Sequence, residues 1–219
     1  MTASSAPAAR PSRPGDAGSR NSLTSVALFG LSMITLTAEI VQLRVFSFSV
    51  NPVFVYMVIR VALLGFGLSG ALLTVTPRLR NVAPETALGI CLLGFGIGNL
   101  FANHLFAHYS HLIKPSQGIT LISSTALLFA SFTIPYFFSG LGVAMVLLSD
   151  SASVGRNYFI NLAGSAAGCF IVYPFLDLLG AEYTILLVSV VCVLAGAAVT
   201  WRHTSALRPV LVAGSNNRW

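Results

Sequence analysis

The stretch AEIVQLRVFS, residues 38–47, decides how this chain folds, because it places two charges at the end of a long apolar run that begins at Leu23. A charge at the centre of a membrane-spanning helix costs about 3 kcal/mol or more, so it usually faces protein or water. Glu39 and Arg44 lie five positions apart, about 140° around a helix, and therefore do not pair along one face. The sequence predicts that their partners come from other helices.

The composition places the chain among integral membrane proteins. Of its 219 residues, 55% are hydrophobic and only 8% are charged, whereas a soluble domain carries roughly 25% charged residues. The net charge of +6 does not indicate nucleic acid binding, since no basic helix or aromatic platform stands outside the apolar runs. We expect the lipid bilayer, and no nucleic acid, to be a partner.

Six apolar runs are long enough to span a bilayer, which takes about 20 residues. They cover residues 23–46, 53–76, 85–106, 119–148, 157–179 and 181–201. The sequence therefore predicts an all-α integral membrane bundle of six transmembrane helices over residues 22–202. A disordered tail, 1–21, and a short unstructured tail, 203–219, flank the bundle.

Connections and breaks refine this prediction. A short connection at residues 47–52 and a tight turn near Gly180 predict two antiparallel helical hairpins. Pro135 falls in the middle of the fourth run, where a proline removes a backbone hydrogen bond. That run is either one kinked span or a span followed by a surface helix.

The basic residues predict the orientation of the bundle. With the N-terminus inside, the outer loops hold only Lys114 as a basic residue, and nine arginines fall on the inner side. These are Arg10, Arg13, Arg20, Arg78, Arg80, Arg156, Arg202, Arg208 and Arg218. Because basic residues gather in cytoplasmic segments, we expect a bacterial inner-membrane protein with both termini in the cytoplasm.

Arg60 is the nearest candidate partner for Glu39. Each residue lies about seven or eight positions from the outer end of its helix, which places both about 10–12 Å below the outer surface. An ion pair between the first two helices is the simplest prediction, and a proton or cation site built on Glu39 is the alternative. Arg44 lies near the outer interface, where it extends to water or reaches Asp177 and Glu182.

Small residues recur at spacings that favour close helix packing. They are Asn157, Asn161, Gly164 and Gly168 in the fifth run, Gly94 and Gly98 in the third, and Gly65 and Ser69 in the second. Such positions let helix backbones approach closely in lipid. Packing is their predicted role, and a ligand groove is the alternative.

A histidine cluster is a weak candidate for a metal or pigment site. His104, His108 and His111 share one face if the third helix reaches residue 111, but no carboxylate or cysteine stands nearby to complete a metal site. The sequence shows no glycine-rich phosphate loop, no nucleophile elbow and no zinc-binding His-Glu helix. We therefore predict no catalytic residue, no metal and no cofactor.

Two segments resemble the membrane part of bacterial proteins in which a multi-helix domain precedes a spermidine-synthase-like domain. The first, residues 31–70, contains AEIVQLRVFS and then ALLGFGLSG at residues 62–70. The second, residues 135–180, contains GRNYFINLAGSAAG at residues 155–168 and PFLDLLG at residues 174–180. The chain departs from that family's pattern at Arg60 and Asn161.

The resemblance implies a function without catalysis. In that family, a cytoplasmic aminopropyltransferase-like domain of polyamine chemistry follows the last helix. Here the chain ends 18 residues after Trp201, so the resemblance implies a membrane domain that lacks its enzyme. We expect a non-catalytic multi-pass module that anchors or scaffolds a partner, either a spermidine-synthase-like protein or a larger membrane complex. The alternative is a small dimeric transporter with Glu39 and Arg60 in its path.

Overall fold

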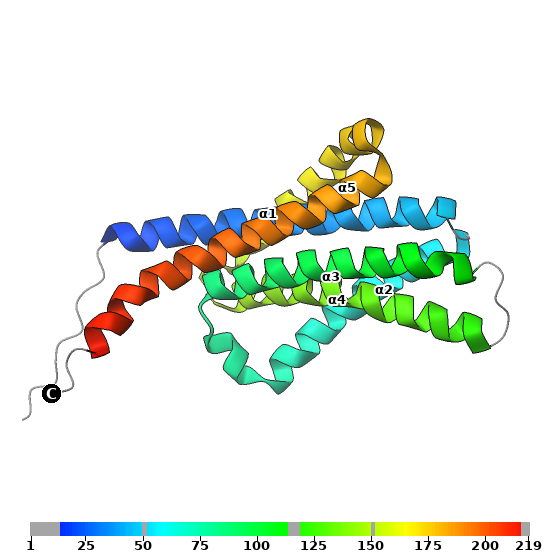
Figure 1. The fold of residues 1–219 in the computed structure, drawn as a ribbon. Helices are drawn as coiled ribbons and strands as arrows, with labels where there is room; N and C mark the ends of the chain where they lie inside the picture. The colour runs from blue at the N-terminus through cyan, green and yellow to red at the C-terminus, as the bar shows by residue number, and fades with distance from the viewer. Residues whose placement is uncertain (1–13, 50–51, 114–118, 150–151, 216–219) are drawn as a thin grey trace, which may run out of the picture.

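The structure, a computed structural model, describes residues 14–49, 52–113, 119–149 and 152–215 (Figure 1). Every regular element in these ranges is a helix. In chain order they are α1 (Pro14–Ser49), α2 (Pro52–Val75), the 3₁₀ helix η1 (Pro77–Asn81), α3 (Pro84–Ile113), α4 (Ile119–Ser149) and α5 (Val154–Ser215). Proline stands at the start of α1, α2, η1 and α3. Its fixed φ suits the first helical position, where its missing N–H would have had no partner within the helix.

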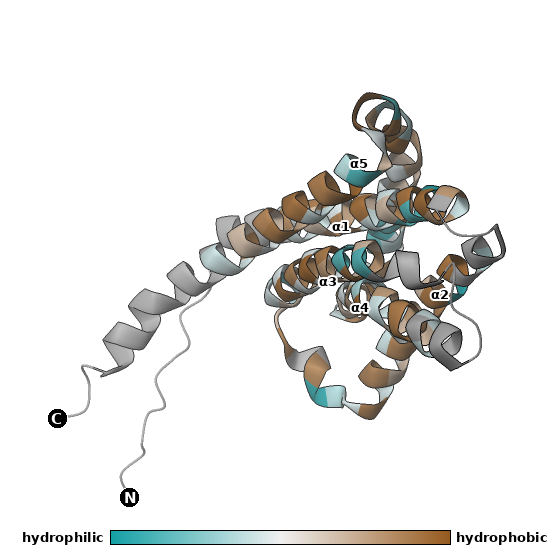
Figure 2. Ribbon diagram, turned by 45° about the vertical axis from the view of Figure 1, so that its right-hand side comes forward, coloured by the Kyte–Doolittle hydropathy of each residue, from teal (hydrophilic) through white to brown (hydrophobic). Residues whose placement is uncertain are grey.

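Within the described ranges, five helices are long and apolar enough to cross a membrane. Figure 2 shows that hydrophobic residues predominate along these helices. Large apolar side chains remain exposed on the outside of the bundle, for example Leu63 on α2 and Phe170 on α5. Lipid is the solvent that suits such a surface, so the chain forms a multi-pass membrane bundle.

The last two predicted runs both fall within α5, which Gly180 interrupts. Its φ of 77° and ψ of 171° are not helical, and a positive φ is a conformation that residues with side chains rarely adopt. The chain turns back there, at the gold-coloured tip between the yellow and orange parts of α5 in Figure 1. The Thr184 hydroxyl donates to the Phe175 carbonyl across the turn at 3.1 Å. We call residues 154–179 the first arm of α5 and residues 181–215 its second arm.

The helices do not pack in chain order. The most extensive contacts of α1 are with α5, those of α2 are with α4, and α3 lies between α4 and α5. Three aromatic rings join α1, α3 and α4: the Phe46 ring centre lies 4.6 Å from the tilted Phe106 ring and 5.3 Å from the Phe132 ring, which meets it edge to face. The predicted hairpin of the first two helices therefore exists in the chain, but its two helices pack mainly against other elements.

The tails differ from the predictions, and the fourth run takes the first of its two predicted forms. α1 begins at Pro14 and α5 continues to Ser215, so residues 14–21 and 203–215, predicted to be irregular, are helical. Ala206, Leu207 and Arg208 are strong helix formers, and a helix is free to continue beyond the bilayer. Residues 1–13 and 216–219 lie outside the described residues. The fourth run is a single helix, α4, with Pro135 inside it.

Candidate functional site: a polar pocket inside the bundle

A polar pocket of about 350 Å³ lies inside the bundle, partly open to its surface. Four helices line it: α1, α2, α4 and the first arm of α5. The lining residues are Ser32, Thr35, Leu36, Glu39, Phe66, Ser139, Val143, Asn161 and Ser165. Six of these nine carry a polar side chain. This concentration is unusual in a bundle whose surface is otherwise apolar, and it marks the pocket as the candidate site.

Hydrogen bonds join the walls of this pocket. The Ser32 hydroxyl of α1 lies 2.7 Å from the Asn161 amide oxygen of α5 and 2.9 Å from the Leu28 carbonyl oxygen. The Thr35 hydroxyl shares a 2.7 Å hydrogen bond with the Ser139 hydroxyl of α4. Through these two bonds α1 holds both α4 and the first arm of α5, and so keeps the pocket's shape.

Glu39 is the charged residue of the pocket, and it is half-buried. Among the residues that the structure describes, Glu39 forms no ion pair and no hydrogen bond. Arg60, its predicted partner, is exposed on α2 and does not line the pocket. The predicted Glu39–Arg60 pair is therefore absent from the described part of the chain.

The reason lies in the register of α2 against α1. Phe66, not Arg60, shares the pocket with Glu39. Six residues separate Arg60 from Phe66, which is about 9 Å along a helix. Counting depth from a shared turn assumes two helices packed side by side, whereas α1 packs mainly on α5 and α2 mainly on α4. Arg60 is instead exposed on the surface of α2.

Arg44 also lies apart from the pocket. Its side chain is exposed, and its guanidinium carbon lies 5.8 Å from the centre of the Phe48 ring, one turn later on α1. Asp177 and Glu182, its two predicted acidic partners, are exposed on either side of the Gly180 turn. In the described ranges, neither forms an ion pair with Arg44.

A second polar cluster lies one turn along α1 and is closed. The Tyr136 hydroxyl donates to the Gln42 amide oxygen at 2.5 Å, and the Gln42 amide nitrogen donates to the Asn99 amide oxygen at 2.7 Å. The Asn99 amide nitrogen then donates to the Ser189 hydroxyl at 2.8 Å. All four side chains are buried. This chain of bonds, which we call the Gln42 network, links α1, α3, α4 and the second arm of α5.

The Gln42 network is what the sequence reasoning missed. Two of its members, Gln42 and Asn99, are amides within apolar runs, a signal that a side chain faces the bundle interior. The network also borders the pocket, because Gln42 lies three residues after Glu39 on α1, and Tyr136 lies three residues before Ser139 on α4. The two polar regions are therefore neighbours on one side of α1.

Close backbone contacts hold the first arm of α5 against α1. A Cβ atom added to Gly164 would lie 2.5 Å from the Phe29 carbonyl oxygen, and one added to Gly168 would lie 2.5 Å from that of Met33. No side chain fits at either position. Asn161 belongs to the same stripe but faces the pocket, so the stripe serves both as a packing surface and as part of the pocket wall.

The other predicted packing residues also lie between helices. A Cβ atom on Gly65 would meet the α4 backbone at Phe137, and one on Gly94 would meet the Phe138 ring of α4. One on Gly98 would lie 3.1 Å from Ile134. Ser69 and Asn157 are buried. The Ser69 hydroxyl donates to the Phe66 carbonyl on α2, and the Asn157 amide nitrogen lies 3.5 Å from the hydroxyl of Ser153, the residue before α5.

The predicted histidine cluster does not form a metal site in the described residues. His104 and His108 are exposed on α3, and the side chain of His111 lies outside the described part of the structure. No group of three metal-binding side chains comes together in the part that is described.

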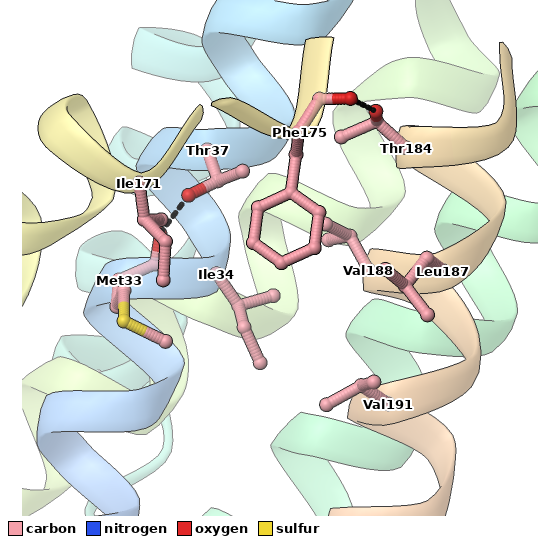
Figure 3. Close-up of a pocket in the computed structure, with 9 residues that line it drawn as sticks. All are labelled: Met33, Ile34, Thr37, Ile171, Phe175, Thr184, Leu187, Val188 and Val191. Atoms are coloured by element: carbon pink, nitrogen blue, oxygen red, sulfur yellow. Dashed lines mark hydrogen bonds between the residues drawn. The ribbon is translucent and has the colours of Figure 1, made fainter. Parts of the chain in front are cut away.

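A second pocket, of about 140 Å³, lies between α1 and the two arms of α5 (Figure 3). Its lining residues are Met33, Ile34, Thr37, Ile171, Phe175, Thr184, Leu187, Val188 and Val191. The Phe175 ring projects into the space between α1 and the second arm. Both hydroxyl groups that line this pocket form hydrogen bonds to backbone. Thr37 donates to the Met33 carbonyl at 2.8 Å, and Thr184 donates to the Gly180 carbonyl at 2.6 Å. This pocket offers only hydrocarbon contacts.

No protein-family model, curated protein or solved structure matches this chain. The resemblance to spermidine-synthase-like membrane proteins therefore stays a prediction. The candidate site rests on the geometry of the polar pocket alone.

Proposed function

We propose that this chain is a membrane carrier that binds a small solute in the polar pocket around Glu39. The observation that supports the proposal is a half-buried carboxylate without a partner among the described residues, in a pocket that is partly open and lined by five further polar side chains. Intramembrane carboxylates are costly and typically belong to ion, proton or substrate pathways. A scaffold needs packing surfaces but has no use for an open, charged pocket.

The proposed carrier crosses the membrane six times, with both termini in the cytoplasm of a bacterial cell. Support for the sixth span comes from the apolar part of α5, Val154–Trp201, which is 48 residues long. At 1.5 Å per residue, a straight helix of that length would measure about 72 Å, more than twice the hydrocarbon thickness of about 30 Å. A turn at Gly180 divides it into two arms of ordinary spanning length.

Reporter fusions test this topology directly. A cytoplasmic reporter fused after residue 219 should be active, and one inserted between residues 107 and 118 should be active only as a periplasmic reporter. This expectation follows from the distribution of basic residues, because nine arginines fall in the predicted inner segments and only Lys114 in the predicted outer loops. A periplasmic C-terminus would contradict the six-span arrangement.

Uptake into liposomes tests the carrier function and identifies the solute in the same experiment. Purified protein is reconstituted and incubated with a defined mixture of amines, amino acids, sugars, organic acids and salts, and the lumen contents are measured by mass spectrometry. At least one solute should accumulate with the wild type and not with Glu39→Gln. Glu182→Gln is the matched control, because it makes the same change at an exposed residue outside the pocket.

The competing result would support the scaffold hypothesis. If no solute accumulates in a Glu39-dependent way, and the protein instead purifies with a stable partner, then the carrier proposal is wrong.

A further inference from the structure

The lining of the pocket around Glu39 also indicates which class of solute it suits, an inference that rests on the proposed carrier function. Charge is the first constraint. Glu39 is the single charged side chain among the lining residues, and none of them is basic. An anion there would face an uncompensated carboxylate at low dielectric, whereas one positive charge would be matched.

Hydrogen-bonding capacity is the second constraint. The Ser32 hydroxyl lies within donating distance of two oxygens, those of Leu28 and Asn161. The Thr35 hydroxyl lies 2.7 Å from the Leu31 carbonyl oxygen and also bonds Ser139. The hydroxyl protons are therefore directed at protein oxygens, and the lone pairs of these hydroxyls remain to accept. A solute rich in N–H donors fits such a wall, and an ammonium group has three donors and no acceptor.

Size and apolar surface are the third constraint. About 350 Å³ is far more than the roughly 30 Å³ that one water molecule occupies, so a bare metal ion would leave most of the pocket empty. It corresponds to the lower end of the range for organic ligands. Leu36, Phe66 and Val143 supply apolar walls beside the polar ones, which suits a short hydrocarbon chain.

From these three constraints we propose that the pocket binds a small organic monocation, a primary alkylammonium whose charged end lies against Glu39 and whose alkyl chain lies against Phe66 and Val143. A second ammonium group on the same solute would find no second carboxylate among the lining residues. The pocket therefore discriminates against diamines as well as against neutral and anionic analogues.

Isothermal titration calorimetry on the full chain in an uncharged detergent tests this inference. The probes are n-butylammonium, butan-1-ol, butyrate and butane-1,4-diammonium, which share four carbons and differ in charge. We expect saturable binding of n-butylammonium, and at least tenfold weaker binding of the other three. Equal binding of butan-1-ol, or displacement of n-butylammonium by sodium at equal concentration, would overturn the proposal.

Variants locate the binding at the pocket. Glu39→Gln should weaken n-butylammonium binding at least tenfold, and the matched control Glu182→Gln should leave it unchanged. Ser165→Leu, which fills the pocket from the first arm of α5, should weaken binding while keeping the carboxylate, and it serves as the second variant if Glu39→Gln does not fold. Unchanged binding in both pocket variants would contradict the site.

The binding and uptake experiments test different proposals, so each can contradict one without the other. Glu39-dependent uptake of a solute other than an amine would support the carrier function and contradict the proposal that the pocket binds an alkylammonium ion. Glu39-dependent binding of n-butylammonium without uptake of any solute would keep the amine site and refute the carrier.

Discussion

The two polar regions on α1, the pocket around Glu39 and the Gln42 network, lie one helical turn apart and differ in how completely their groups are paired. In the network each buried amide and hydroxyl bonds another helix. In the pocket the Glu39 carboxylate has no protein partner among the described residues and is only partly buried. Closed polar groups stabilise a bundle in lipid, whereas an open carboxylate makes no bond that holds the helices together and remains available to a ligand.

The two regions also use different helices. Both involve α1 and α4, but the network takes α3 and the second arm of α5, and the pocket takes α2 and the first arm. A substitution that displaces the first arm of α5 should therefore distort the pocket and leave the hydrogen bonds of the Gln42 network intact. A substitution at Gln42 should break the network and leave the pocket intact, and the two expectations can be tested separately.

The largest effect is expected from Gly168→Leu. Its Cβ would lie 2.5 Å from the Met33 carbonyl oxygen, so the first arm must move away from α1. Overpacking against backbone of this kind should cost about 3 kcal/mol in the free energy of unfolding by dodecyl sulfate. The pocket should lose its ligand affinity at the same time.

Gly70→Leu is the matched control for that substitution. A Cβ at Gly70 meets nothing within 4 Å, and the residue is exposed on α2. Its stability should change by less than about 0.5 kcal/mol. If Gly168→Leu unfolds at the same detergent fraction as the wild type, then the close approach of the first arm to α1 is not what holds the pocket together.

An intermediate effect is expected from Gln42→Leu, which removes two interhelical hydrogen bonds and leaves the buried Tyr136 hydroxyl without its acceptor. A buried polar group left unpaired costs about 1–3 kcal/mol, so we expect a loss of about 2 kcal/mol in the same unfolding assay. The double variant Gln42→Leu/Tyr136→Phe should recover part of that loss, because it removes the unpaired hydroxyl as well. A double variant no more stable than Gln42→Leu alone would argue against the network as a closed structural unit.

Most of the fold could be predicted from the sequence because apolar length and turn residues are local signals. The predicted run 53–76 matches α2 to within one residue at each end, and the run 85–106 lies inside α3. The turn expected near Gly180 is present, with a positive φ at that glycine. Helix ends outside the bilayer could not be predicted in this way. Residues 14–21 and 203–215 contain proline, glycine and polar residues and no long apolar run, so the sequence predicts an irregular chain there.

Most of the site could not be predicted, because it depends on which helices meet. Glu39 is recognisable from the sequence as a costly charge, but its neighbours Asn161 and Ser139 come from helices far along the chain. Counting residues from the first turn predicted Arg60 at its side, and the observed neighbour on α2 is Phe66. A shift of about one and two-thirds turns between two helices that pack mainly on other elements leaves no trace in the sequence of either helix alone.

The smallest effect on stability is expected at the two charges themselves. Because Glu39 and Arg60 form no ion pair in the described structure, Glu39→Gln and Arg60→Gln should each change the unfolding free energy by less than about 0.5 kcal/mol. In a double-mutant cycle their effects should add, with a coupling energy below about 0.5 kcal/mol. Only Glu39→Gln should abolish uptake and weaken n-butylammonium binding.

This last cycle decides whether the Glu39 pocket is functional or structural. A buried ion pair broken at one end typically costs about 3–5 kcal/mol, and removing both ends restores much of the loss. Coupling of more than about 1 kcal/mol would therefore mean that Arg60 reaches Glu39 in the membrane and that the carboxylate is a structural partner. Additive effects on stability, combined with loss of binding only at Glu39, are what an open site predicts, since its carboxylate serves the ligand and contributes little to the stability of the bundle.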